Sequence, residues 1–147
     1  MSKDYLGIII ILICLFFLVS QNTYSSSKEE DYKLQEQCGK RSEEYFKKEY
    51  NNGFSTYENI QITSHYQNHY NKKLNKCFIL METTYYNTYT KKNDSFIKDI
   101  NDINENKKYG SFSRIQIDYS PITCEVSGKT CKSEEEWDKL VKPYMEE

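Results

Sequence analysis

Four of the five cysteines lie in the part of the chain that follows its long apolar segment. They are Cys38, Cys77, Cys124 and Cys131. An even number of cysteines in a small exported chain predicts disulfide bonds, and two bridges limit the possible folds more than any other feature of this sequence. Four cysteines allow three connectivities.

The spacing of the cysteines favours one connectivity. The residues between Cys124 and Cys131 include a Ser-Gly pair at which the chain can reverse direction, so we expect these two cysteines to be bonded. Cys38 and Cys77 then pair by elimination. In the chain-entropy view, closed loops of about 8 and about 40 residues contribute roughly 2.5 and 4 kcal/mol of stability. Zinc binding is the alternative, but no pair of cysteines has the short gap of a metal knuckle.

The apolar segment Leu6–Val19 lies close to the amino terminus. As a helix it would reach about 21 Å, short of the roughly 30 Å of a bilayer core, so it is typical of a secretory signal. We expect residues 1–20 to be a signal peptide, whether cleaved or retained as a membrane anchor, and residues 21–27 to be a flexible tether. Cys14 follows a bulky isoleucine, whereas a lipoprotein signal requires a small residue there. We expect it to be one more apolar residue of the signal.

The composition agrees with a single exported domain. The chain has 147 residues, room for one domain of ordinary size, and we expect residues 28–147 to form it. Its formal net charge of -2 lacks the positive excess of general nucleic-acid-binding proteins, so nucleic acid is not an expected partner. The signal and the paired cysteines predict a periplasmic or secreted location.

Helical periodicity predicts a helix near each end of this domain. Ser27 begins a capping box, and the first helix should run over about residues 28–50, where an Asn-Asn-Gly sequence ends it. Ser133 begins a second capping box, followed by apolar residues at i, i+3, i+4 and i+7 spacing. Because proline lacks a backbone donor, we expect Pro143 to end or bend the second helix near Val141.

The residues between the two helices predict strands. Apolar alternation or an unbroken apolar run marks four segments, which are Asn59–Gln67, Lys76–Tyr86, Phe96–Ile103 and Tyr109–Ile117. The predicted fold is α+β, with an antiparallel sheet of about four strands, an N-terminal and a C-terminal helix packed on it, and two disulfides.

Several segments of the chain carry a resemblance to other proteins. They are His69–Leu80, Asp102–Lys107, Cys124–Cys131 and Glu136–Glu146. In these segments the chain resembles a group of small bacterial exported proteins and lipoproteins. The resemblance implies a bacterial exported domain. Since no activity, cofactor or catalytic residue is attached to that group, it implies no site.

No motif of the sequence predicts catalysis. His65 and His69 have the i, i+4 spacing of a helical zinc motif, but on a strand four residues span about 13 Å, too far for both imidazoles to reach one ion at about 2 Å. In an oxidising compartment Cys77 should be bonded rather than nucleophilic. We therefore expect no catalytic residue, no metal ligand and no cofactor, and a protein that is not an enzyme.

Paired lysines mark the predicted strand connections. If the strands form an up-and-down meander, the first and third turns share one end of the sheet and gather lysines into a candidate binding surface for an anionic envelope polymer. Its residues are Lys72, Lys73, Lys76, Lys107 and Lys108. The alternative is that lysines at turns only keep the strand edges soluble.

Tyrosines offer another candidate surface. Tyr85, Tyr86 and Tyr89 would stack on a sugar or a peptide if they shared a face, although tyrosine is also common in strands. Together these features predict a non-catalytic binding module for a cell-envelope component or a protein partner. The alternatives are a periplasmic inhibitor or immunity-type protein against a lytic enzyme and, third, a small hydrolase. Membrane contact is expected only through the N-terminal segment, if that segment is retained.

Overall fold

The computed structural model describes residues 28–115 and 120–146. The chain divides into two compact units, Met1–Leu34 and Gln35–Glu147. In the first unit the described residues, 28–34, are helical, and the second unit holds the sheet. The expected signal peptide, the tether and Cys14 lie outside the described residues. Within the described ranges, no helix has the length and apolar character needed to cross a bilayer.

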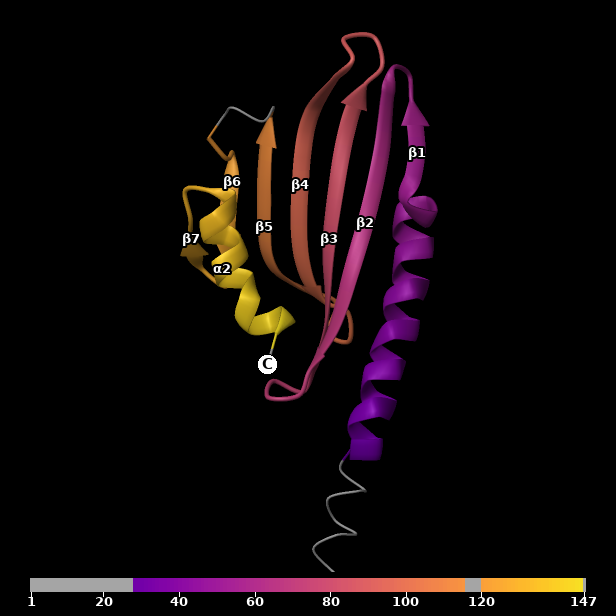
Figure 1. Cartoon of the computed structure of the whole chain (residues 1–147), viewed down its shortest axis with the longest axis vertical. Coiled ribbons are helices and arrows are strands. Elements are labelled where there is room, and N and C mark those ends of the chain that lie inside the picture. Colours follow the sequence, from indigo (N-terminus) through magenta and orange to yellow (C-terminus); the bar gives the residue numbers. More distant parts are fainter. Residues whose placement is uncertain (1–27, 116–119, 147) are drawn as a thin grey trace, which may run out of the picture. The chain divides into compact units, whose positions relative to one another are not determined.

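Within the described residues, seven antiparallel strands form one sheet, and each strand pairs with its neighbours in chain order (Figure 1). They are β1 (Phe54–Tyr57), β2 (Ile60–Asn71), β3 (Lys76–Asn87), β4 (Lys92–Asp102), β5 (Lys107–Ile115), β6 (Thr123–Val126) and β7 (Lys129–Thr130). The predicted up-and-down arrangement of β2 to β5 therefore holds.

The prediction of about four strands is wrong. The four predicted segments correspond to β2 to β5, and the sheet also contains β1, β6 and β7. β1 follows the first helix after only a short 3-10 turn, η1 (Asn51–Gly53), and its four residues are too few to show a period. β6 and β7 are the two short sides of the Ser-Gly reversal, which the sequence predicts only as a turn closed by a disulfide.

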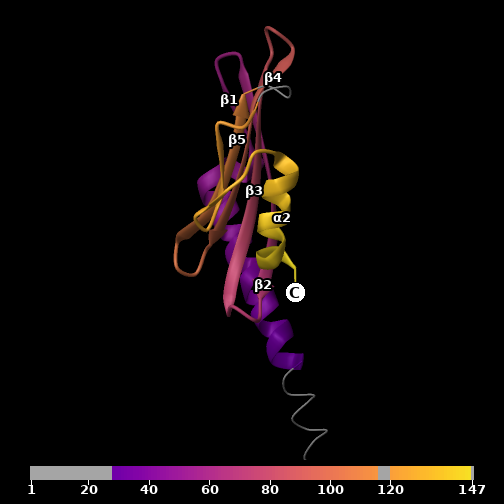
Figure 2. The same ribbon diagram turned by 90° about the vertical axis from the view of Figure 1, so that its left-hand side faces the viewer.

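Helical residues 35–50 and α2 (Glu134–Met145) lie on opposite faces of the sheet (Figure 2). Successive residues of a strand point to opposite sides. In β3, Cys77 therefore faces the first helix, to which it is bonded, whereas Phe78 faces α2. These two sides are named the first-helix face and the α2 face.

Both disulfides have the predicted connectivity. Cys38 of the first helix is bonded to Cys77 of β3, and the two residues are only 2% and 1% exposed. Cys124 of β6 is bonded to Cys131, which closes the β6–β7 hairpin. One bond thus joins the first helix to the centre of the sheet, and the other secures the segment that leads into α2.

Removing the two disulfides should have unequal effects on stability. Cys38→Ala with Cys77→Ala should lower the free energy of unfolding by about 4 kcal/mol, and Cys124→Ala with Cys131→Ala by about 2.5 kcal/mol. The reason is loop length, because the bonded residues are 39 and 7 positions apart, respectively. Urea unfolding followed by circular dichroism measures both losses. A larger loss for the hairpin pair would contradict this explanation.

The main core lies between α2 and the sheet. Phe78, Ile100 and Phe112 from the strands pack with Trp137 and Val141 of α2, and each of these residues is 4% exposed or less. Trp137 and Val141 belong to the apolar stripe that the sequence places on this helix, and Ser133 caps it as predicted by accepting a hydrogen bond from the backbone of Glu136.

Pro143 does not end α2, so the prediction that the helix stops near Val141 is wrong. The helix continues to Met145 because contacts with the sheet hold its last turn. The Asn71 side chain donates hydrogen bonds to the carbonyl oxygens of Pro143 and Tyr144, at 3.0 and 3.3 Å. The Tyr144 ring meets Phe78 edge-on. These contacts offset the hydrogen bond that proline cannot make.

A buried cation joins α2 to β4. The Lys98 side chain is 8% exposed, and its ammonium lies 2.8 Å from a Glu134 carboxylate oxygen and 3.0 Å from one of Asp138. Burial alone would lower the pKa of Lys98, but hydrogen bonds to these two carboxylates outweigh it and raise the pKa. The ammonium also lies 5.6 Å from the Trp137 ring. The lysine is held charged, and α2 is fixed in its orientation on the sheet.

Candidate functional site

Part of the first-helix face is not covered by any described helix, because the first helix ends at residue 50 (Figure 1). A row of directly paired residues crosses this region: Ile62 pairs with Tyr85, Tyr85 with Ser95, and Ser95 with Ile115. Directly paired residues share a face, so the row is continuous. We name this region the open face and define it by its larger side chains, which are Tyr57, Ile60, Ile62, Tyr85, Ile97 and Ile115.

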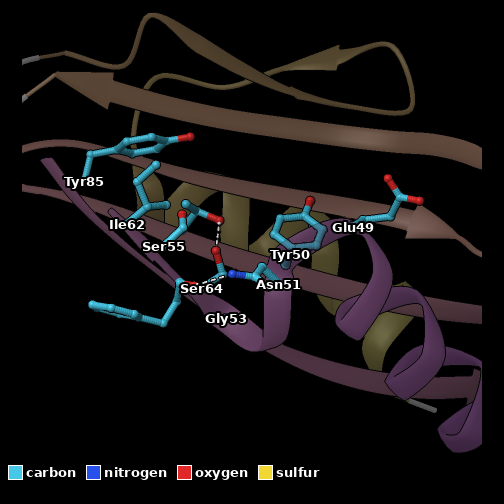
Figure 3. A pocket seen from close by; sticks show the side chains of 10 residues that line it. Glu49, Tyr50, Asn51, Gly53, Ser55, Ile62, Ser64 and Tyr85 are labelled. Atoms are coloured by element: carbon cyan, nitrogen blue, oxygen red, sulfur yellow. Dashed lines mark hydrogen bonds between the residues drawn. The ribbon is translucent and has the colours of Figure 1, made fainter. Parts of the chain in front are cut away.

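A pocket opens on this face where the first helix ends (Figure 3). Its volume is about 260 Å³, just below the roughly 300–1,000 Å³ of sites for drug-sized ligands, so it suits one side chain or one small ring. Tyr50, Tyr85 and Glu49 are among the residues that line it, whereas Phe54, which borders it in the chain, pairs with Thr63 and directs its side chain to the α2 face.

Hydroxyl groups form another part of the pocket wall. Ser64 and Thr83 are both buried, and their hydroxyl oxygens share a hydrogen bond of 2.9 Å. Ser55 contributes a third hydroxyl. None of the residues that line the pocket is a lysine, an arginine or a histidine. The pocket therefore combines aromatic rings, hydroxyl oxygens and one negative charge.

A tight reversal of the backbone places the pocket beside the helix end. Asn51, Asn52 and Gly53 have φ angles of 48°, 56° and 85°, the left-handed region that the predicted Asn-Asn-Gly stop favours. Gly53 also packs closely. A Cβ atom there would lie 2.5 Å from the Ser64 carbonyl oxygen and 2.6 Å from Cζ of Phe46. Only glycine fits this position.

Gly53→Ala should destabilise the protein far more than Gly128→Ala. Both glycines have a positive φ, 85° and 79°, but a Cβ atom at Gly128 would have no neighbour within 4 Å. Gly128→Ala therefore measures backbone strain alone, about 1 kcal/mol, whereas Gly53→Ala adds a steric clash and should cost about 3 kcal/mol or more. Thermal and urea unfolding compare the two variants. Equal losses would mean that Gly53 is not closely packed in solution.

Tyr50 remains protonated over the physiological range. Burial raises the pKa of its hydroxyl to about 12, with smaller contributions from ionisable neighbours that include Asp99 and Glu49. Its ring stacks on Phe46, with centroids 5.9 Å apart. The hydroxyls of Tyr50 and Tyr85 make no hydrogen bond with any described residue, so both are available at the pocket.

Exposed apolar side chains lie on separate strands and turns at the end of the sheet beside the open face. The β1–β2 and β3–β4 turns meet there, since Asn59 O accepts a 2.8 Å hydrogen bond from Thr88 N. Tyr57 ends β1, Tyr89 lies in the β3–β4 turn, and Ile115 ends β5 at the same end. Their exposed fractions are 70%, 84% and 53%. This region is named the apolar end.

The predicted lysine residues lie together at the opposite end of the sheet. The β2–β3 and β4–β5 turns share that end, as the meander predicts. This region, the lysine end, comprises Lys72, Lys73, Lys76, Lys107 and Lys108. Lys72, Lys73 and Lys107 are exposed, and the ammonium of Lys107 lies 5.2 Å from the Tyr109 ring centroid.

Lys76 and Lys108 of the lysine end lie in ion pairs with carboxylates. Lys76 Nζ lies 2.7 Å from Asp102, which is fully buried, and 2.6 Å from Glu105. Hydrogen bonds to both carboxylates raise the pKa of Lys76. Lys108 Nζ lies 2.8 Å from Asp99. These carboxylates balance much of the positive charge that the sequence pattern indicates for this end.

The other residues considered from the sequence do not form a site. His65 and His69 lie on the α2 face of β2, and within the described ranges no group of three His, Cys, Asp or Glu residues is arranged to hold a metal ion. Tyr85 and Tyr86 point to opposite faces of β3, and Tyr89 lies in the next turn, so the three do not share one stacking surface.

Comparison of the chain with protein-family models, with curated proteins and with solved structures found no match. The chemistry of the site is therefore inferred from its own residues. Sequence reasoning missed the pocket because its walls come from five separate elements. The only local signal was the Asn-Asn-Gly stop, which marks where the helix ends.

Proposed function

We propose that this protein is a non-catalytic binding module that holds a protein partner on the open face. One observation carries the proposal: large tyrosine and isoleucine side chains from five adjacent strands, some of them exposed, share the open face with a pocket. Contiguous exposed apolar residues mark interaction surfaces in soluble proteins, and aromatic residues are enriched at such interfaces.

The chemistry of the pocket supports binding rather than catalysis. Its lining holds one carboxylate and no histidine, lysine or cysteine, so the lining lacks a base of the kind that activates a serine or cysteine nucleophile in Ser-His and Cys-His pairs. The absence of basic residues from that lining also disfavours a polyanion at this site. The open face carries both apolar side chains and hydroxyl groups over several strands. A ligand that suits such a face is the surface of another protein, which presents both kinds of group.

We also propose that the protein acts outside the cytosol, in the periplasm or as a secreted protein. The two disulfides support this location because such bonds persist mainly in oxidising compartments. A protein partner would then be an exported or surface protein. If that partner is a lytic enzyme, the module is an inhibitor or immunity-type protein, which an assay of the enzyme with equimolar module would reveal.

Site-specific photocrosslinking tests the proposed surface. The photoreactive residue p-benzoyl-phenylalanine replaces Tyr57 or Ile115 on the open face, or Leu74 at the lysine end as a matched control. Leu74 is also a large exposed apolar residue, 45% exposed. In cells of the native host, both open-face positions should crosslink the same protein, and the Leu74 position should not.

The captured protein then provides the decisive measurement. Tyr85→Ser with Ile62→Ser should weaken its binding at least about tenfold, because the central residues of an interface contribute most of the affinity. Leu74→Ser should leave binding unchanged. Crosslinking from Leu74 alone, or unchanged affinity in the double variant, would show that the open face is not the binding surface.

The lysine end is a second candidate surface, for an anionic envelope polymer. The observation that favours it is the meeting of two lysine-bearing turns at one end of the sheet. Long-range attraction would drive such binding, so it should weaken as salt rises.

Charge reversal tests the lysine end. Lys72→Glu, Lys73→Glu, Lys107→Glu and Lys108→Glu together should abolish binding to heparin, used as a defined polyanion, at low salt. The same number of reversals at exposed lysines of the first helix and α2, Lys40, Lys47, Lys139 and Lys142, matches the change in net charge. Equal loss in both variants would assign the binding to overall charge, and no loss in the first would eliminate the lysine end.

A further inference from the structure

We infer that the pocket on the open face anchors one basic side chain, a lysine or an arginine, of the bound partner. This inference rests on the proposed function, because it specifies what the partner presents to the open face. The pocket is small enough for a single side chain, and its lining has the groups that bind a cation.

Aromatic rings and oxygen atoms supply the contacts. The rings of Tyr50 and Tyr85 offer π faces, which attract ammonium and guanidinium groups. The hydroxyls of Ser64 and Thr83 use only one hydrogen and one lone pair in their mutual bond, so lone pairs remain to accept hydrogen bonds. The apolar stem of the incoming side chain would lie against Ile62.

The charges around the pocket favour a cation over a neutral or anionic group. Glu49 lies in its lining, and no positively charged residue does. Asp99 does not line the pocket and is paired with Lys108 at 2.8 Å, so Glu49 is the carboxylate that the pocket itself contributes. An anion would be repelled here.

The present partner of Glu49 is easily exchanged. Its carboxylate lies 3.1 Å from the ammonium of Lys48, in an ion pair between side chains that are 46% and 82% exposed. Exposed ion pairs of this kind contribute little to stability. A cation inside the pocket, next to aromatic rings and away from water, would interact more strongly with Glu49 than Lys48 does.

A titration with amino-acid amides tests the inference. The full chain, with both disulfides formed and labelled with ¹⁵N, is titrated with Nα-acetyl-lysine amide, Nα-acetyl-arginine amide and Nα-acetyl-norleucine amide. Norleucine matches the lysine stem and lacks the charge. The backbone signals of Ser64, Thr83 and Tyr85 should shift with the two basic probes, and these should bind at least about fivefold tighter than norleucine.

Two variants test whether the charge of Glu49 is responsible for binding the lysine probe. Glu49→Gln should weaken binding of the lysine probe about fivefold, and raising NaCl should weaken it further. Glu44→Gln, at an exposed position of the same helix outside the pocket, should leave binding unchanged. Equal affinity for norleucine and lysine, or equal effects of Glu49→Gln and Glu44→Gln, would overturn the inference.

The two proposals fail in different ways. If photocrosslinking from the open face captures a partner whose affinity Glu49→Gln does not change, the cationic anchor is wrong and the proposed function stands. If the lysine probe binds the pocket but Tyr57 and Ile115 capture no partner, the proposed function is wrong and the cation chemistry of the pocket stands.

Discussion

The bond between Cys38 and Cys77 is the constraint on which the first-helix side of the unit depends. It fixes one residue of the helix to the central part of the sheet, and each further turn of the same helix face then has a defined position. Ser42 lies 3.9 Å from the Cys77 sulfur, Phe46 packs on Tyr66, and Tyr50 reaches the pocket. Cys38, Ser42, Phe46 and Tyr50 recur every four positions and so share one face of the helix. The disulfide at Cys38 therefore sets the point on the sheet above which the helix ends and beside which the pocket opens.

The α2 face is held by a different kind of interaction. The apolar stripe of the helix packs on the sheet, and Lys98 in addition has Glu134 and Asp138 facing it. A buried cation without its carboxylates is costly, so these ion pairs specify one orientation. The six side chains that define the open face take part in no ion pair with the described residues, so its proposed role as a binding surface does not require such a network to be broken.

Much of the fold follows from local patterns in the sequence. Residues that are close in the sequence determine the two capping boxes, the alternation in β2 and the Ser-Gly reversal. The predicted pairing of the cysteines follows from that reversal. Pro143 was misjudged because its compensation comes from Asn71, which is distant in the sequence. Lys98 and the pocket were missed for the same reason: the partners of each come from separate elements, and no spacing in a single segment reveals them.

The strict chain order of the sheet affects how the protein can reach this structure. Every strand pairs with the strand before or after it, so the contacts of the sheet close short loops, and low contact order favours rapid folding. Each hairpin can form as soon as its two strands are available, so the sheet can grow strand by strand from β1 to β7. The junction of the first helix with β3 is the exception, since oxidation must join cysteines that are 39 positions apart. Pairing of the strands needs no oxidant, whereas the covalent link between the first helix and β3 forms only when both thiols are oxidised.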